Sequence, residues 1–142
     1  MLDDFRAVLE LNVVAPLAMM QAVLPTMRRQ GAGAIINVSS GTTLADVPGT
    51  GGYVASKVAL ERLSAIARNE LEGSGVAVST VIPFATSTEF LTSIKAGRAE
   101  AEEMTAGADF DTPEQVAEAI LELIDSGAPR LDLVPKAYGG TR

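Results

Sequence analysis

The sequence predicts an α/β fold, a partial Rossmann-like doubly wound parallel sheet in which three strands are flanked by helices. Helical and strand-like patterns alternate along the 142 residues, which is typical of parallel α/β architecture. The first expected strand is a short β-branched run, typical of a parallel strand that is covered on both faces. Glycine-rich segments separate the elements and no internal repeat interrupts them.

A long helix is expected over residues 3–29, because apolar residues recur there at helical spacing. Pro16 lies inside this pattern and has no backbone donor, so a bend is expected near Asn12. Gly31 and Gly33 are expected to end the helix. The positions that form its apolar face are Val8, Leu11, Leu17, Met20, Val23, Leu24 and Met27.

The first strand is expected over residues 34–38, and the glycine-rich segment 39–52 that follows it is expected to be a loop. A second helix is expected from about Gly52 to Glu72, because glycines follow it at positions 73 and 75. The residues expected to be buried on this helix are Val54, Val58, Leu60, Leu63, Ile66, Ala67 and Leu71.

The second strand is expected over residues 76–82, and residues 84–110 are expected to be irregular. A third helix is expected to begin at Thr112, which can cap it, because Pro113 suits the first turn and Gln115 completes a capping box. This helix is expected to stop at Gly127, and a third short strand is expected over residues 131–134.

The order of elements suggests that residues 1–142 form a single partial domain. No strand leads into the first helix, and the first strand is too apolar to be a comfortable sheet edge. We therefore expect the second half of a larger doubly wound sheet.

The composition excludes several classes of chemistry. The chain contains no histidine and no cysteine, which excludes histidine-dependent nucleophilic triads, thiolate clusters and imidazole-ligated metals within it. A net charge of -7 makes nucleic acid an unsuitable partner. The start lacks the pattern of a signal peptide, and the apolar stretch from Leu11 to Pro25 is too short to span a bilayer. We expect a soluble cytoplasmic protein without a membrane partner.

The pair Tyr53 and Lys57 is the strongest local signal for chemistry. Positions i and i+4 share one face of a helix, so the ammonium group of Lys57 is expected near the phenol of Tyr53. A nearby cation lowers the pKa of a phenol, which then serves as a general acid or base. Taken alone, the same spacing also describes a tyrosine and a lysine that both face solvent.

Two more polar residues belong to the candidate site. Ser40 follows the first expected strand, and the carboxyl ends of strands are where doubly wound sheets bind ligands. Its neighbour Ser39 can take the same role, and either serine can instead satisfy its own backbone. Asn12 lies just before the expected bend, where its alternative is a helical asparagine that faces water.

Taken together, these segments resemble the carboxy-terminal part of the short-chain dehydrogenase/reductase family. The resemblance covers residues 3 to 135, and its combined spacing is specific although no single motif is. The segments that carry it are Phe5 to Asn12, Leu24 to Met27, Ile35 to Ser40, Tyr53 to Lys57, Pro83 to Thr88 and Thr112 to Glu114.

The resemblance implies a role for each matching residue. Tyr53 is then the catalytic acid or base, and Lys57 lowers its pKa and binds the nicotinamide ribose. Ser40 stabilises the substrate carbonyl or hydroxyl, and Asn12 holds a water in a proton relay. Pro83 and Thr88 belong to the cofactor-binding segment, in which Thr88 contacts the nicotinamide carboxamide.

The implied reaction is hydride transfer between NAD or NADP and a small-molecule carbonyl/alcohol pair. The residue that would distinguish the two cofactors is absent, and a lid over the substrate is expected at about residues 88–110. Phe84 departs from the family pattern, which has glycine after the proline, so its side chain is expected to crowd the nicotinamide or redirect the loop. The family's amino-terminal strand and glycine-rich turn have no counterpart here.

Three interpretations follow from the sequence. The first is an oxidoreductase of this family recorded without its amino-terminal half, with weak cofactor binding by the chain alone. The second is an inactive association module, or a chain that needs a companion half; in the family, the helices around Asn12 and Tyr53 often pair across a dimer interface, so a homodimer or homotetramer is expected. The third is a chain that does not fold, produced by a false internal start at Met1.

Overall fold

The structure is a computed structural model that describes residues 1–86, 99, 102–103, 106–107 and 109–142. Its principal elements in chain order are α1 (Leu2–Leu9), η1 (Glu10–Val14), α2 (Ala15–Gln30), β1 (Gly33–Val38), η2 (Gly41–Leu44), α3 (Gly51–Glu70), β2 (Val76–Ile82), α6 (Pro113–Ser126), β3 (Arg130–Asp132) and η3 (Lys136–Tyr138).

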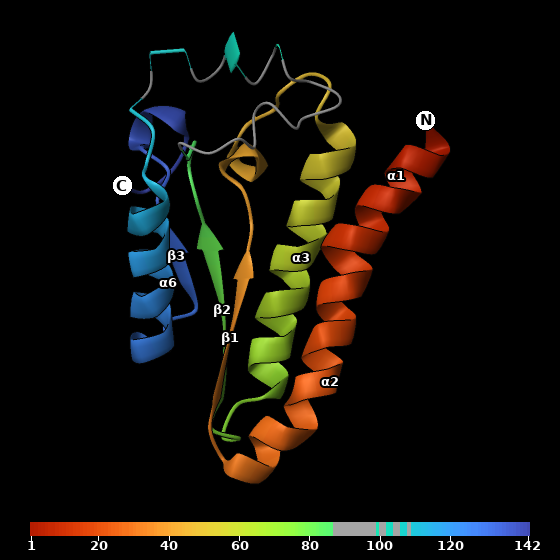
Figure 1. Cartoon of the computed structure of the whole chain (residues 1–142), viewed down its shortest axis with the longest axis vertical. Coiled ribbons are helices and arrows are strands. Elements are labelled where there is room, and N and C mark those ends of the chain that lie inside the picture. Colours follow the sequence, from red (N-terminus) through yellow and green to blue (C-terminus); the bar gives the residue numbers. More distant parts are fainter. Residues whose placement is uncertain (87–98, 100–101, 104–105, 108) are drawn as a thin grey trace.

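The described strands form one parallel sheet in the order β1-β2-β3, with helices on both of its faces (Figure 1). α3 covers one face, and α1, η1 and α2 run alongside α3 as one long helical rod. α6 covers the other face. The fold is therefore the predicted α/β architecture, with three parallel strands and flanking helices.

The central strand β2 supplies most of the core. Six of its seven residues are buried, and successive side chains point to opposite faces of the sheet. Val76 and Val78 pack with Met20 of the rod and with Leu71, whereas Val81 packs with Leu123 of α6. One strand thus joins both helical layers.

The structure tests two expectations about the other strands. β1 contacts α2 and α3 on one face and α6 on the other, as expected, although most of its side chains stay partly exposed and among the described residues it pairs with β2 alone. The third strand lies at Arg130–Asp132 rather than 131–134. Val134 is nevertheless almost fully buried, because it packs against Ile82 beyond the end of the strand.

A π-helical turn stands where the sequence predicts a bend in the first helix. Pro16 has no N–H to donate to the carbonyl of Asn12, so the regular i to i−4 pattern is interrupted there. The backbone N–H of Ala15 donates to the carbonyl of Glu10, five residues earlier. The rod ends at Gly31 in a left-handed conformation, as expected, whereas Gly33 already begins β1.

Most of the apolar face that the sequence assigns to the rod is at least partly buried. Met20 is buried, and of the seven expected positions only Leu11 and Leu17 are exposed. Met19, which lies outside that set, is largely exposed as well. By length and composition, the 29-residue helix Leu2–Gln30 is long and apolar enough to cross a membrane, although the stretch 11–25 considered alone is not. In the structure this helix packs along α3.

α3 buries only part of the set expected on it, since Leu60 and Leu71 are buried and two other expected positions are exposed. Ser56, Leu60 and Ser64 are buried at successive i+4 positions, whereas Val58 and Ile66 are both 48% exposed. Small side chains on the buried stripe let the helix approach the sheet closely. Val58 and Ile66 therefore remain on the outer surface of α3.

Candidate active site

The candidate site lies where β1 and β2 end, beside the first turns of α3. Tyr53 and Lys57 lie on α3, and Ser40 follows β1 and begins the 3₁₀ turn η2. Because the strands are parallel, their carboxyl ends share one edge of the sheet, which is where doubly wound folds bind ligands.

Ser40 and Tyr53 are joined by a side-chain hydrogen bond. Burial raises the pKa of Tyr53 above its usual value, and the hydrogen bond with Ser40 opposes this rise without cancelling it. Ser40 also caps the turn that follows it, because its Oγ accepts from the backbone N–H of Thr42 at 3.3 Å. The serine therefore has the local backbone role and faces the phenol as well.

The neighbouring Ser39 does not share this position. Its side chain is 3% exposed, and its Oγ donates to a carboxylate oxygen of Glu61 on α3 at 2.5 Å. Of the two serines between which the sequence leaves a choice, Ser40 is thus the one that is hydrogen-bonded to Tyr53.

Lys57 lies near Tyr53, as the spacing predicts. The Nζ atom lies 5.8 Å from the centroid of the Tyr53 ring and donates to the carbonyl of Val38 at 3.0 Å. Burial lowers the pKa of Lys57 itself. The ammonium group thus lies over the phenol ring and is held by the end of β1.

Asn12 reaches the same part of α3 through Ser56. Its Nδ2 donates to the Oγ of Ser56 at 3.0 Å, and that Oγ donates in turn to the carbonyl of Tyr53 at 2.6 Å. Ser56 is fully buried, and the sequence analysis assigns it no role. Its place three residues after Tyr53 and one turn before Leu60 is the signal that would have placed it on the inner face.

The segment after β2 is anchored to the loop that holds Ser40. The carbonyl of Pro83 accepts from the backbone N–H of Gly41 at 2.9 Å. Phe84 is buried, and its ring centroid lies 4.8 Å from that of Tyr138. Its side chain therefore packs in the core beside Tyr138, and the expected effects on the nicotinamide or on the course of the loop stay predictions.

Thr88 and most of the expected lid at 88–110 lie outside the described residues. Asp111, just after that segment, is held from both sides. Its backbone N–H donates to the carbonyl of Ala85 at 2.9 Å, and its carboxylate accepts from Arg142 at 2.7 Å.

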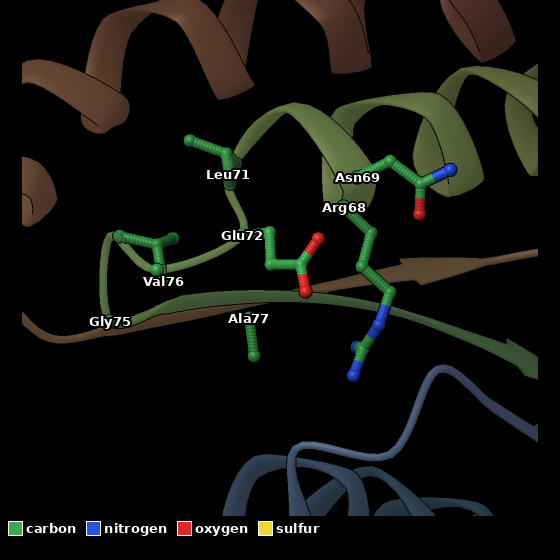
Figure 2. A pocket seen from close by; sticks show the side chains of 8 residues that line it. Arg68, Asn69, Leu71, Glu72, Gly75, Val76 and Ala77 are labelled. Atoms are coloured by element: carbon green, nitrogen blue, oxygen red, sulfur yellow. The ribbon is translucent and has the colours of Figure 1, made fainter.

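Two pockets flank α3, one at each end. A pocket of about 290 Å³ is lined by residues of the loop before α3, among them Ala45 and Pro48, and by Val54 of α3, beside the turn that carries Tyr53. A larger one of about 420 Å³ lies at the other end of α3 (Figure 2) and includes none of the candidate site residues. There, Arg68 extends past β2 and donates to the carbonyls of Val78 and Gly127 at 2.8 and 2.6 Å, so its guanidinium links chain segments.

Comparison with known proteins gives one consistent result. A family model described as short chain dehydrogenase matches residues 1–99. A dehydrogenase named OXI1 from Cochliobolus heterostrophus is 33% identical over 131 residues, which are 87% of this chain and 56% of the relative. Sulfoacetaldehyde reductase 2 from Chromohalobacter salexigens is 36% identical over 124 residues, covering 87% of this chain and 48% of the relative.

Solved structures agree with this result. A short-chain dehydrogenase from Streptomyces avermitilis superposes with a TM-score of 0.82 at 26% identity, over 96% of this chain and 55% of its own. The closed form of a serine dehydrogenase complexed with NADP⁺ superposes with a TM-score of 0.81 at 28% identity, over 96% of this chain and 58% of its own. The chain spans about half the length of the curated relatives it matches.

Proposed function

This chain belongs to the short-chain dehydrogenase/reductase family, and from that premise we propose that it carries the catalytic half of an NAD(P)(H)-dependent oxidoreductase. The proposed reaction interconverts a carbonyl and an alcohol on a small-molecule substrate. The observation that carries the proposal is the meeting of Ser40 and Tyr53 beside Lys57 at the carboxyl ends of the strands.

In the proposed mechanism Tyr53 exchanges a proton with the oxygen of the substrate. The phenol is protonated at neutral pH and is therefore in the form that donates a proton to a carbonyl, whereas its raised pKa in this chain makes it a weaker acid than a free phenol. Ser40 already shares a hydrogen bond with the phenol, so its Oγ is placed to bind the same substrate oxygen. The link from Asn12 through Ser56 to the carbonyl of Tyr53 fixes the turn of α3 that carries the phenol.

The described residues fit only one end of a dinucleotide. Lys57 and Tyr53 lie on one face of α3 and offer an ammonium and a hydroxyl, the donors suited to a nicotinamide ribose. The bound nicotinamide supplies or accepts the hydride. The glycine-rich segment before α3 serves another purpose, because a Cβ on Gly52 would lie 3.1 Å from the Phe5 ring. Gly52 therefore lets the helical rod pack close to α3, and we do not assign it a phosphate-binding role.

The substrate class stays at the level of a small carbonyl or alcohol. The relatives include a sulfoacetaldehyde reductase, a 2-(R)-hydroxypropyl-CoM dehydrogenase and a 3alpha-hydroxysteroid dehydrogenase, whose substrates share little beyond the reacting group. Such diversity within one fold is expected, because specificity lies in the loops around a shared site.

Cofactor binding is the experiment that tests the proposal. We expect weak NAD(P)H binding and negligible turnover for these 142 residues alone, measured by calorimetry and nicotinamide fluorescence, because the described residues offer donors suited to the ribose end alone. Adding an amino-terminal strand and glycine-rich turn, as an extension or as a companion chain, is expected to restore binding. Micromolar NAD(P)H binding by the 142 residues alone would contradict the expectation that tight binding requires the amino-terminal strand and glycine-rich turn.

A matched pair of variants tests the role of the phenol in the cofactor-binding form. Tyr53→Phe removes the proton donor and is expected to lower turnover by roughly 10²-fold or more. Cofactor affinity is expected to fall much less, because the Lys57 donor to the ribose remains. Tyr138→Phe changes the other tyrosine of the chain and is expected to retain turnover. Full activity of Tyr53→Phe would overturn the mechanism.

The alternative function is an association module that does not catalyse. The exposed apolar side chains on the rod and on the outer surface of α3 favour it, including Leu11, Leu17, Met19, Val58 and Ile66. We propose the same surface as the contact of a homodimer or homotetramer, and its test is given in the Discussion.

A further inference from the structure

Three successive residues at the end of β1 are each bound by a different residue of α3. The carbonyl of Val38 accepts from Lys57, the hydroxyl of Ser39 donates to Glu61, and Ser40 meets Tyr53. The three helix residues are spaced by four positions, so they lie on one face of α3, one turn apart. Two of these contacts involve the proposed catalytic groups, and the third, from Ser39 to Glu61, does not.

Glu61 is held by two different strands of the sheet. One carboxylate oxygen accepts from Ser39 beyond β1 at 2.5 Å, and the other accepts from Arg130 of β3 at 3.3 Å. Its side chain is 19% exposed, whereas that of Arg130 is 44% exposed. A carboxylate that is largely withdrawn from water requires such partners, so its position is strongly determined.

We propose that Glu61 is a positioning residue, which holds the end of β1 through Ser39 at the distance from α3 at which Ser40 meets Tyr53. Glu61 lies two helical turns from Tyr53 and acts through the backbone of residues 39–40. Ser39 is also fixed by its backbone N–H, which donates to the carbonyl of Val81 at 2.9 Å. The buried hydroxyl therefore has little freedom to find another partner once Glu61 is removed.

The positioning role of Glu61 rests on the proposed function, because Ser40 and Tyr53 are the proposed catalytic groups. It can be tested without measuring enzyme activity. The chain contains no tryptophan and two tyrosines, so a Tyr138→Phe background leaves Tyr53 as the one phenol whose ionisation changes the ultraviolet absorbance. The background change is conservative, because phenylalanine keeps the ring that packs against Phe84. Failure of cofactor binding would count against the proposed function and leave this measurement intact.

The direction of the shift separates positioning from simple electrostatics. Loss of the negative charge in Glu61→Ala would by itself lower the pKa of Tyr53, because an anion disfavours the phenolate. Loss of position weakens the Ser40 contact, which lowers that pKa in the wild-type chain, and so raises it. The other charged groups that contact this network are Lys57 and Arg130, and both are retained in the variant.

We expect Glu61→Ala to raise the pKa of Tyr53 by no more than Ser40→Ala does. Ser39→Ala removes the same link without changing the charge and is expected to give a rise as well, which keeps the test decisive if Glu61→Ala fails to fold. Glu61→Gln retains an oxygen that accepts from Ser39 and is expected to restore most of the original pKa. Glu70→Ala, an exposed carboxylate on the same helix, is the control and is expected to leave Tyr53 unchanged.

An unchanged pKa of Tyr53 in Ser39→Ala, or a fall in Glu61→Ala, would overturn the proposal. The first result would mean that Ser40 keeps its place without the Ser39 link, and the second that Glu61 acts on the phenol only through its charge.

Discussion

At the scale of single residues, the site is controlled by burial as much as by charge. Tyr53 and Lys57 are both shifted towards their neutral forms, because burial raises the pKa of the phenol and lowers that of the ammonium group. Ser40 is the group that counteracts this effect at the phenol. The protonated phenol is the form that a carbonyl reduction requires.

The Ser40 contact leads to a first prediction. In the Tyr138→Phe background, Ser40→Ala is expected to raise the pKa of Tyr53 further, because the hydrogen bond that favours the phenolate is lost while burial remains. Ultraviolet titration of the phenol measures this shift. Ser74→Ala, at the distant end of α3, is the control, and a fall in the pKa on Ser40→Ala would show that the serine disfavours the phenolate.

A second residue-scale prediction concerns the turn before β2. Gly75 has φ near +78°, and a Cβ there would lie 1.9 Å from the carbonyl oxygen of Gly31. Gly75→Ala is therefore expected to lower the free energy of unfolding by roughly 3 kcal/mol or more. Gly73 has the same φ with nothing within 4 Å, so Gly73→Ala is the matched control, with an expected cost of about 1 kcal/mol. Equal losses in urea titrations would show that the clash is relieved.

At the scale of elements, α6 is defined at both ends by its sequence. The backbone N–H of Gln115 donates to Oγ1 of Thr112, and the Gln115 side chain accepts from the backbone N–H of Thr112 at 2.7 Å. Gly127 ends the helix in a left-handed conformation. Between these ends, Leu123 is fully buried against the sheet.

The capping box gives a third prediction. Thr112→Ala is expected to lower the free energy of unfolding by about 1 kcal/mol, because the first turn of α6 loses its side-chain acceptor. Thr112→Ser keeps that acceptor and is expected to leave the free energy of unfolding almost unchanged. Urea unfolding followed by circular dichroism compares the two. Equal stabilities would mean that the side-chain cap contributes nothing.

At the scale of the whole molecule, one apolar side is left uncovered. The rod and the outer surface of α3 form one side of the molecule (Figure 1), and large apolar side chains are exposed on both. Association of two copies through this side would remove the exposed apolar surface from water. The net charge of -7 opposes non-specific association but does not prevent a specific apolar contact.

A fourth prediction tests this surface. The chain is expected to be dimeric or larger at tens of micromolar, and Met19→Glu on the rod is expected to shift it towards monomer, because a carboxylate would be buried at the contact. Leu121→Glu introduces the same charge at an exposed leucine of α6, on the other layer, and is expected to leave the dimeric contact intact. Size-exclusion chromatography with light scattering measures both variants. A clean wild-type monomer would contradict the prediction.

The sequence by itself determined the elements whose signals are local. The capping box of α6, the left-handed glycines at 31 and 127, and the interruption at Pro16 each depend on a residue and its near neighbours along the chain. The family and fold follow from the combined spacing of Tyr53, Lys57 and the strand before them, which the family model and the parallel sheet confirm. The functional roles assigned to those residues stay predictions.

Only the tertiary structure decided which faces and partners are used. Helical spacing correctly identifies Leu60 as buried on α3, but it does not predict that Ser56 and Ser64 are buried beside it. The spacing of Tyr53 and Lys57 likewise predicts that they are close. It does not predict that Nζ of Lys57 lies 5.8 Å from the centroid of the Tyr53 ring, or that it donates to the carbonyl of Val38. The pKa of a side chain and the partner of a buried polar group depend on atoms far away in the sequence, and their distances are fixed only when the layers pack.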